Sequence, residues 1–236
     1  MDSLFIVMPA YNEEENIEGV VKQWYPVLYG KDEKSRLVIA DSGSTDKTHE
    51  KLKILQREYP KLEILSETPK QHGPKVIALY DYAIKQGAAY VFQTDSDGQT
   101  DPVEFDGFWE NRKQYDGIFG YRNAREDGRI RSFVEKIVCF LLRIYFGIKV
   151  PDANAPFRLM NVQTVKKYLY KLPSDYHIPN IIITTYFVYY NEKTLFKTIS
   201  FQSRQGGKNS INILSIIKTG WKALGDFKGM KREMRN

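Results

Sequence analysis

The chain has 236 residues and a mass of 27.5 kDa, which suits one large α/β domain and is short for two independent ones. Its 42% apolar and 27% charged residues exclude a disordered or collagen-like chain, and its single cysteine, Cys139, excludes a disulfide framework and a cysteine-based zinc site. The net charge of +6 hides an asymmetry, because residues 1–111 have 12 basic against 20 acidic side chains (−8) and residues 112–236 have 23 against 9 (+14).

The first half alternates short apolar strands with amphipathic helices. Strands are predicted at residues 4–8, 36–40, 62–66, 89–93 and 117–120, and helices at 12–30, 47–59, 76–86 and 103–114. This alternation predicts an α/β fold of the Rossmann-like kind, a mostly parallel sheet with helices on both faces. Polar turns at residues 9–14, 41–46 and 95–101 each follow a strand. We expect them to meet at the carboxyl edge of the sheet, where such folds bind ligands.

The basic half has a less regular pattern. It predicts a long aromatic-rich helix over residues 129–148, a loop and short strand over 151–161, a short helix over 162–170 and a strand over 199–204. Residues 181–190 suit either a strand or a helix. Residues 210–224 have apolar side chains at helical spacing with lysines among them, which predicts a C-terminal amphipathic basic helix.

We find no targeting signal and no transmembrane segment in the sequence. The N-terminus lacks a basic leader region, and the apolar stretches 138–148 and 181–190 are shorter than the roughly 18–20 residues that cross a bilayer. We therefore expect a cytoplasmic protein. Each basic residue near an anionic bilayer contributes about 1 kcal/mol of attraction. A membrane contact is favoured over a merely solvated helix face by Lys218, Lys222, Lys228, Lys231, Arg232 and Arg235.

The most informative motif is Asp95-Ser-Asp97-Gly-Gln99, which follows a predicted strand. Residues i and i+2 of an extended segment point the same way, so the two carboxylates can share one divalent cation, and Gln99 can add an amide oxygen. An ordinary turn also uses this pattern, but two further acidic turns at the same edge favour a metal site. No Gly-x-Gly-x-x-Gly and no Walker A loop follows a strand, so phosphate recognition depends on a metal or on basic side chains.

The three turns together resemble a known family. Pro9-Ala-Tyr-Asn-Glu13, Ala40-Asp41-Ser-Gly-Ser-Thr-Asp46-Lys-Thr48 and Asp95-Ser-Asp97-Gly-Gln99 are similar to the nucleotide-sugar motifs of family 2 glycosyltransferases, which have the GT-A fold. Three further segments resemble one branch of this family, the dolichyl-phosphate mannosyltransferases or polyprenyl-phosphate glycosyltransferases. They are Gly120-Tyr-Arg122, Asp152-Ala-Asn-Ala-Pro-Phe-Arg158 and Ser203-Arg204-Gln-Gly-Gly-Lys-Asn-Ser210. Asn154-Ala-Pro156 departs from the usual Thr/Ser-Ser-Gly, and residues 72–75 lack a glycine-rich run.

The resemblance implies a role for each motif. The nucleotide sugar would be bound by Pro9, Ala10, Tyr11, Glu13, Asp41, Ser42, Asp95 and Ser96. Asp41 would accept hydrogen bonds from the base, whereas Glu13 also suits a helix N-terminal charge. Asp95, Asp97 and Gln99 would hold Mg²⁺ or Mn²⁺, a Lewis acid on the leaving diphosphate.

The same resemblance places the acceptor in the basic half. An acceptor phosphate would be bound by Arg122, Arg131, Arg204 and Lys208, each of which alone also suits a solvated surface charge. Asp152 would act as a base for a hydroxyl acceptor or would orient Arg122 or Arg204. The apolar helix from residue 133 to 148 would pack under the sheet or present one face to lipid.

We therefore expect an inverting glycosyltransferase that moves a hexosyl unit from a GDP- or UDP-sugar to a polyprenyl or dolichyl phosphate. It would act at the cytoplasmic membrane face, as a peripherally associated protein. A saccharide hydroxyl acceptor, as in cell-surface polysaccharide synthesis, is the alternative. A nucleic-acid-binding module would leave the acidic turns without a purpose, so we expect no nucleic acid partner. The expected catalytic domain spans residues 1–210, with a nucleotide-sugar part (1–120), an acceptor part (121–210) and then a basic tail (211–236).

Overall fold

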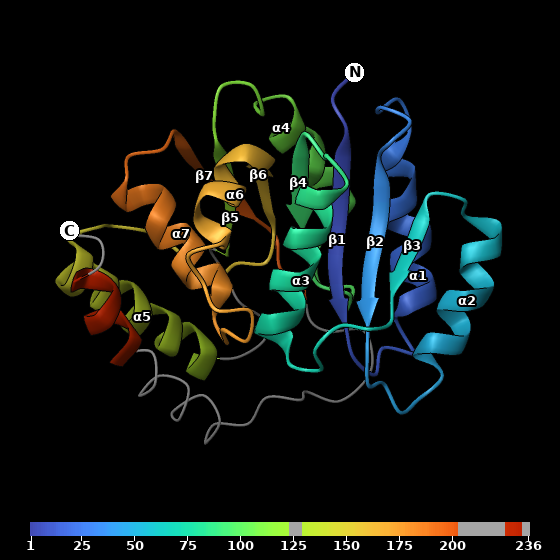
Figure 1. Ribbon diagram of the computed structural model, residues 1–236, viewed down its shortest axis with the longest axis horizontal. Helices are drawn as coiled ribbons and strands as arrows, with labels where there is room; N and C mark the ends of the chain where they lie inside the picture. Colours follow the sequence, from blue (N-terminus) through green and yellow to red (C-terminus); the bar gives the residue numbers. More distant parts are fainter. Residues whose placement is uncertain (123–128, 203–224, 233–236) are drawn as a thin grey trace.

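The computed structural model describes residues 1–122, 129–202 and 225–232, with only the backbone described for residues 129–132. Its centre is a seven-stranded sheet in the order β3-β2-β1-β4-β6-β5-β7 (Figure 1). The strands are β1 (Leu4–Ala10), β2 (Arg36–Asp41), β3 (Leu62–Leu65), β4 (Tyr90–Gln93), β5 (Gly117–Arg122), β6 (Arg158–Asn161) and β7 (Thr194–Ile199).

Most neighbouring strands are parallel, as the alternation of strands and helices predicts. β1 pairs in parallel with β2 and β4, β2 with β3, and β5 with β7. β6 is the exception, because it runs antiparallel to both β4 and β5. β5 therefore has the same direction as β1 and β4, and its carboxyl end at Arg122 lies on the same edge of the sheet as the three polar turns.

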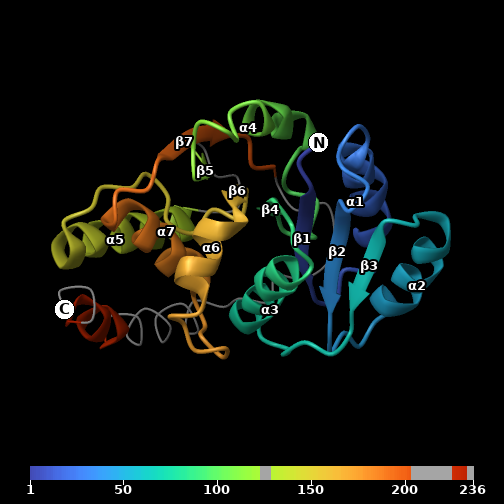
Figure 2. The same ribbon diagram turned by 45° about the horizontal axis from the view of Figure 1, so that its top comes forward.

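Helices cover both faces of the sheet, as expected. They are α1 (Ile17–Trp24), α2 (Thr48–Glu58), α3 (His72–Lys85), α4 (Asp106–Trp109), α5 (Arg129–Phe146), α6 (Val162–Leu169) and α7 (Pro179–Tyr189), with short 3₁₀ turns η1 (Tyr25–Leu28) and η2 (Pro102–Phe105). A last helical segment spans residues 225–232. Figure 2 shows α1 and α3 on opposite sides of the strands.

Side-chain alternation along β1 divides the core into two parts. Phe5 and Val7 pack with α3, α5, α6 and α7, whereas Leu4, Ile6 and Met8 pack with α1, α2 and α4. Both faces of this strand are thus buried, which explains why it appears in the sequence as a continuous apolar run rather than an alternating one.

Several predicted bounds differ from the structure for identifiable reasons. The helix expected from residue 12 begins only at Ile17, because Asn12 adopts a left-handed backbone with φ 54° and belongs to the turn. The helix expected at 103–114 is reduced to η2 and the short α4. Residues 181–189 are helical as part of α7, which is so deeply buried that its apolar run has no helical period.

The strand predicted at residues 199–204 is wrong. β7 ends at Ile199, where that strand was expected to begin, and residues 200–202 are not in a strand. β7 lies at the sheet edge and is mostly half-exposed, with Lys197 open to solvent, so its sequence lacks the apolar pattern of a buried strand.

Two expectations about the membrane have different outcomes. Within the described ranges, none of the helices is both long enough and apolar enough to cross a bilayer. The amphipathic basic helix expected at residues 210–224 lies outside the described residues, together with Lys218, Lys222 and Arg235.

Candidate active site

The three predicted turns meet at the carboxyl edge of β1, β2 and β4. The Asn12 backbone N–H donates to Ser44 Oγ at 3.0 Å, and Asn12 Oδ1 accepts from the Thr45 backbone N–H at 2.8 Å. Ser96 Oγ donates to the Pro9 carbonyl at 2.8 Å. Parallel strands that end at one edge have therefore brought together turns more than thirty residues apart in sequence.

Asp41, at the end of β2, is buried at 3% exposure and already has fixed partners. Its carboxylate accepts hydrogen bonds from Ser44 Oγ and from His49 Nδ1, the latter at 3.1 Å. Ser42 follows it and is fixed by Thr68 Oγ1 and the Pro69 carbonyl. Asp41 is thus a preorganised acceptor at the strand end, a geometry that suits its predicted role toward a base.

The β1 turn combines an exposed ring with a buried carboxylate. Tyr11 is 44% exposed, so its ring is available to a ligand at the sheet edge. Glu13 is buried, and its side chain accepts from Asn16 Nδ2 at 2.8 Å while its carbonyl accepts from the backbone of Ile17 at 2.8 Å. The contacts of Glu13 therefore organise the start of α1, and its contact with a nucleotide stays a prediction.

Lys75, in the first turn of α3, is a site residue that the sequence analysis missed. The side chain is 1% exposed, and Nζ donates to the carbonyls of Ala10 at 2.6 Å and Ser42 at 3.3 Å. Burial lowers the pKa of Lys75, and the charge of Asp41 acts in the opposite direction. The lysine thus joins the ends of β1 and β2 and places a positive charge among the donor turns.

The Asp95–Gln99 turn follows β4 and contains a carboxylate oxygen that accepts no hydrogen bond from the described residues. Gly98 has φ 73°, and the Gln99 backbone N–H donates to Asp97 Oδ1 at 3.2 Å, which fixes the turn. Asp95 Oδ1 is buried without a hydrogen-bond partner among the described residues, and it lies 3.6 Å from His72 Nε2. A buried oxygen of this kind fits a cation ligand.

The oxygen atoms of this turn fit a cation whose remaining ligands are water or substrate oxygens. Within the described part of the chain, no cluster of three or more histidine, cysteine, aspartate or glutamate side chains could hold a metal ion. Mg²⁺ typically uses one or two carboxylates together with water and substrate phosphates. Asp95 and Asp97 suit that arrangement, and metal binding by Asp95, Asp97 and Gln99 stays a prediction.

Gln99 links the turn to the segment after β7. Its Nε2 donates to the Gln202 carbonyl at 2.7 Å, and the Gln202 backbone N–H donates to the Gln99 carbonyl at 2.9 Å. The preceding residue, Phe201, lies under Arg122, with the guanidinium carbon 5.1 Å from the ring centroid. Residues 201 and 202 therefore connect the end of β5 with the predicted metal turn.

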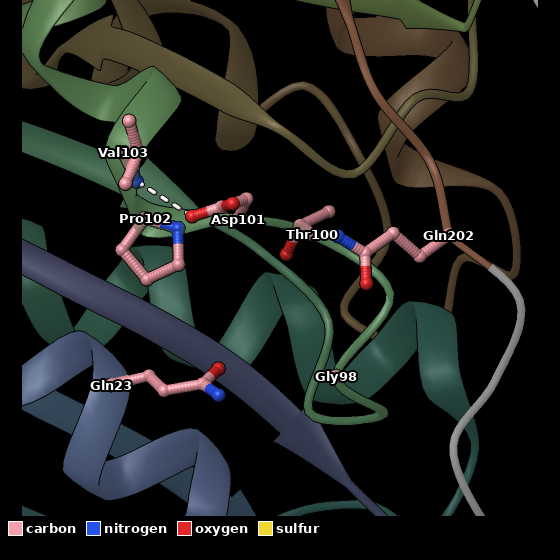
Figure 3. A pocket seen from close by; sticks show the side chains of 7 residues that line it. All are labelled: Gln23, Gly98, Thr100, Asp101, Pro102, Val103 and Gln202. Atoms are coloured by element: carbon pink, nitrogen blue, oxygen red, sulfur yellow. Dashed lines mark hydrogen bonds between the residues drawn. The ribbon is translucent and has the colours of Figure 1, made fainter.

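A pocket of about 310 Å³ lies beside this turn, between α1 and η2 (Figure 3). Its lining consists of Gln23, Gly98, Thr100, Asp101, Pro102, Val103 and Gln202. Asp101 Oδ1 accepts from the Val103 backbone N–H at 2.9 Å and so caps η2. Gly98 of the Asp95–Gln99 turn lines this pocket, whereas none of the individually predicted site residues does.

Arg122, the last residue of β5, belongs to a buried ionic cluster. Its Nε and Nη2 donate to the two carboxylate oxygens of Asp152 at 2.8 and 3.1 Å, a bidentate pair that is almost fully buried. Glu135 of α5, which the sequence analysis missed, lies 3.9 Å from Arg122 Nη2. Burial favours the neutral acid, but Arg122 holds the pKa of Asp152 below its ordinary value. These contacts suit the predicted role of Asp152 in orienting Arg122, and the choice between its two predicted roles stays a prediction.

Arg158 ends the same sequence motif and has a structural role. It is 1% exposed, and its guanidinium donates to the carbonyls of Ala153, Ala155 and Asn180. These contacts fix the loop that holds Asp152. Of the other predicted basic residues, Arg204 and Lys208 lie outside the described residues, and only the backbone of Arg131 is described, in α5.

Comparison with known proteins assigns the fold and the family. The sequence model for Glycosyl transferase family 2 matches residues 5–169. The chain is 30% identical over 169 residues to an uncharacterised glycosyltransferase of Synechocystis, covering 69% of this chain and 51% of that protein. It is 22% identical over 213 residues to undecaprenyl-phosphate 4-deoxy-4-formamido-L-arabinose transferase of Photorhabdus laumondii, covering 90% of this chain and 64% of that protein. The chain thus spans between half and two thirds of these relatives.

A solved structure has the same fold. Glucosyl-3-phosphoglycerate synthase of Mycobacterium tuberculosis, in complex with Mn²⁺ and UDP-glucose, superposes with a TM-score of 0.70 at 18% identity, over 97% of this chain and 79% of that one. This likeness confirms the GT-A fold expected from the three turns.

Proposed function

The chain belongs to glycosyl transferase family 2, and from that membership we propose that it is an inverting enzyme that transfers a hexosyl unit to a polyprenyl or dolichyl phosphate. The donor is a GDP- or UDP-sugar bound at the carboxyl edge of β1, β2 and β4. The acceptor phosphate is bound beside the end of β5, at the cytoplasmic face of the membrane.

The observation that carries this proposal is the position of Arg122. Its guanidinium is fixed by Asp152 at the same sheet edge as the donor turns, and Phe201 and Gln202 connect it to the Asp95–Gln99 turn. Asp152 accepts from two N–H groups of this guanidinium, and arginine is the side chain best suited to bidentate recognition of phosphate. The transferase of Photorhabdus laumondii, which is named for its undecaprenyl phosphate substrate, supports the same class of acceptor.

The state of Asp152 favours a phosphate acceptor over a sugar hydroxyl. A hydroxyl has a high pKa and needs a general base, whereas a lipid phosphate is already anionic near pH 7. Both oxygens of Asp152 accept from Arg122, which lowers the pKa of this carboxyl and makes it a weak base. Asp152 is thus poorly suited to remove a proton from a hydroxyl acceptor.

The reaction then needs positioning more than proton transfer. Asp41 accepts hydrogen bonds from the base, Tyr11 covers the nucleoside, and Lys75 adds a positive charge at this edge. Asp95 and Asp97 would hold Mg²⁺ or Mn²⁺, which supplies Lewis-acid stabilisation of the nucleoside diphosphate leaving group. Arg122 holds the lipid phosphate so that one of its oxygens attacks the anomeric carbon in line. The bond from that carbon to the diphosphate breaks, and the sugar inverts its configuration.

Helix α5 supports a peripheral contact with an anionic membrane. Phe133, Ile137, Phe140 and Ile144, at helical spacing on one face, are 64%, 41%, 61% and 57% exposed. Exposed apolar rings and aliphatic side chains in such a stripe mark an interaction surface. Lys136 and Arg143 are exposed beside them, and the acidic Glu135 of this helix points inward. An apolar stripe flanked by positive charge suits the surface of an anionic bilayer.

A labelled-sugar assay tests the proposal. Purified protein would be incubated with Mn²⁺ or Mg²⁺, a panel of labelled GDP- and UDP-sugars, and either a short-chain polyprenyl phosphate or a saccharide acceptor. We expect label in an organic-extractable lipid that releases its sugar in mild acid, and loss of transfer in EDTA. Label found only on saccharides would support the hydroxyl acceptor instead. Full activity in EDTA would reject the metal role.

A further inference from the structure

Residues 66–72, the loop after β3 with the first residue of α3, cross the sheet edge where the donor turns meet (Figure 1). At the turn after β2, Ser42 Oγ donates a hydrogen bond to the Pro69 carbonyl at 3.0 Å. At the turn after β4, His72 Nε2 lies 3.6 Å from Asp95 Oδ1. The 66–72 segment therefore reaches from one predicted donor turn to the other, although it belongs to neither motif.

Within this segment, Lys70 lies against the glycine of the turn after β2. Gly43 has φ 77°, a left-handed backbone conformation that glycine adopts without steric cost. A Cβ atom at Gly43 would lie 2.8, 2.9 and 3.0 Å from Cδ, Cγ and Cε of Lys70, so the turn also needs glycine to leave room for this side chain. The ammonium is one bond beyond Cε and is therefore held close to the turn that begins with Asp41.

The ammonium of Lys70 has no partner among the described residues. The side chain is exposed, and it forms no ion pair or hydrogen bond within the described ranges. Two neighbouring lysines differ in this respect. Lys51 of α2 pairs with Glu18 at 3.2 Å, and the buried Lys75 of α3 donates to two backbone carbonyls. Lys70 is thus a cation held at the donor turns without an internal role for its charge.

The charges at this edge create a need for such a cation. Asp41, Asp95 and Asp97 lie in the two turns that the segment joins, and residues 1–111 together have a net charge of −8. An anionic diphosphate brought to this edge is repelled by these carboxylates unless nearby cations offset the repulsion. A lysine ammonium is a compact charge with hydrogen-bond donors only, so its strongest partner in a nucleotide is a phosphate oxygen rather than the base.

We propose that the 66–72 segment forms a further wall of the donor site, in which the ammonium of Lys70 binds the diphosphate of the nucleotide sugar. This inference rests on the proposed function, because it concerns the donor of the same reaction. Lys70 donates a charge-assisted hydrogen bond to a phosphate oxygen. The contact of Gly43 with its carbon stem and the hydrogen bond from Ser42 to Pro69 keep the lysine at the turn after β2.

The test is calorimetric titration of uridine, guanosine, UDP and GDP in the presence of Mn²⁺, without an acceptor. Lys70→Met keeps the carbon stem that lies on Gly43 and removes the charge. We expect the Kd of the nucleoside diphosphate to rise about tenfold and the Kd of the matching nucleoside to stay unchanged. Lys70→Arg keeps the charge and should restore most of the affinity for the diphosphate.

Lys47→Met is the matched control, because Lys47 is exposed at the other end of the same turn and its loss changes the net charge equally. We expect this variant to bind the diphosphate as the wild type does. An equal loss of affinity in Lys47→Met would indicate a general effect of charge and would overturn the inference.

The remaining outcomes separate this inference from the proposed function. An unchanged Kd for the diphosphate in Lys70→Met, an equal loss of affinity for the nucleoside, or no binding of UDP or GDP to the wild type would overturn the inference. The expected pattern of Kd values, combined with no transfer from any GDP- or UDP-sugar to polyprenyl phosphate, would reject the proposed function and leave Lys70 as a residue that binds nucleoside diphosphate.

Discussion

Replacing the buried lysine that joins the donor turns should weaken both the fold and the donor site. Lys75→Met keeps the length of the side chain but removes the ammonium that donates to the carbonyls of Ala10 and Ser42. Both carbonyls belong to strand ends that carry predicted donor-binding residues. The variant therefore tests whether this buried charge organises the sheet edge.

The size of the effect follows from two opposed contributions. A buried carbonyl left without its donor costs about 1–3 kcal/mol, and two are affected. Removing the ammonium recovers part of the free energy that burial costs it, a cost seen in the lowered pKa of Lys75. We expect a net loss of about 2 kcal/mol in the free energy of unfolding, or roughly 4–8 °C in Tm for a chain of this size.

The assay is thermal unfolding, together with calorimetric titration of UDP and GDP in the presence of Mn²⁺. Lys85→Met is the matched control, since Lys85 lies on the same helix and its ammonium is exposed beside Asp81. We expect that control to keep both the Tm and the nucleotide affinity of the wild type. The reasoning would be refuted if Lys75→Met melted together with Lys85→Met and bound nucleotide as tightly.

Three further predictions concern the metal, the acceptor and the membrane. Asp97→Asn should lower metal-dependent transfer at least a hundredfold, about 2.7 kcal/mol, because an amide binds a cation more weakly; transfer at the wild-type rate would argue against a metal on Asp97. Arg122→Lys should reduce kcat/KM for polyprenyl phosphate about ten- to a hundredfold, because one of the two charge-assisted hydrogen bonds to Asp152 is lost. The KM for the donor should stay unchanged, and a change confined to that KM would contradict this prediction. Phe140→Ser should lower co-sedimentation with anionic vesicles, and equal binding would exclude the exposed face of α5 as the contact.

The meeting of the three turns at one sheet edge could be predicted because its signals are local. Apolar strands end directly at Asp41 and at the Asp95–Gln99 turn, and parallel pairing then brings these turns to one edge. The antiparallel β6 was not predicted, because a short strand in a loop-rich segment shows nothing of its direction. The edge strand β7 was misplaced because it lacks a buried apolar pattern.

The missed residues are those whose partners are distant in sequence. Lys75 donates to a carbonyl 65 residues away, and Glu135 accepts from a backbone N–H 18 residues away. Neither differs in sequence from an exposed charge on an amphipathic helix. The same applies to the arginines, since only the structure separates Arg122, at the sheet edge, from Arg158, which is buried among carbonyls.

The charge asymmetry of the chain matches the division of the proposed site into a donor part and an acceptor part. The acidic half contains the carboxylates that face a metal-bound diphosphate in the proposed function. The basic half contains Arg122 and the positive charges beside the exposed face of α5. The modest net charge of +6 is the sum of −8 for residues 1–111 and +14 for residues 112–236.

The central claim is that the acceptor is recognised as a lipid anion, and a matched pair of acceptors tests it most directly. Purified protein would receive a labelled nucleotide sugar, Mn²⁺ and either a short-chain polyprenyl phosphate or the polyprenol of the same length without its phosphate. The account predicts label in the phosphate-linked lipid alone, with inverted configuration at the anomeric carbon. Equal labelling of the polyprenol, or transfer only to a saccharide hydroxyl, would contradict it.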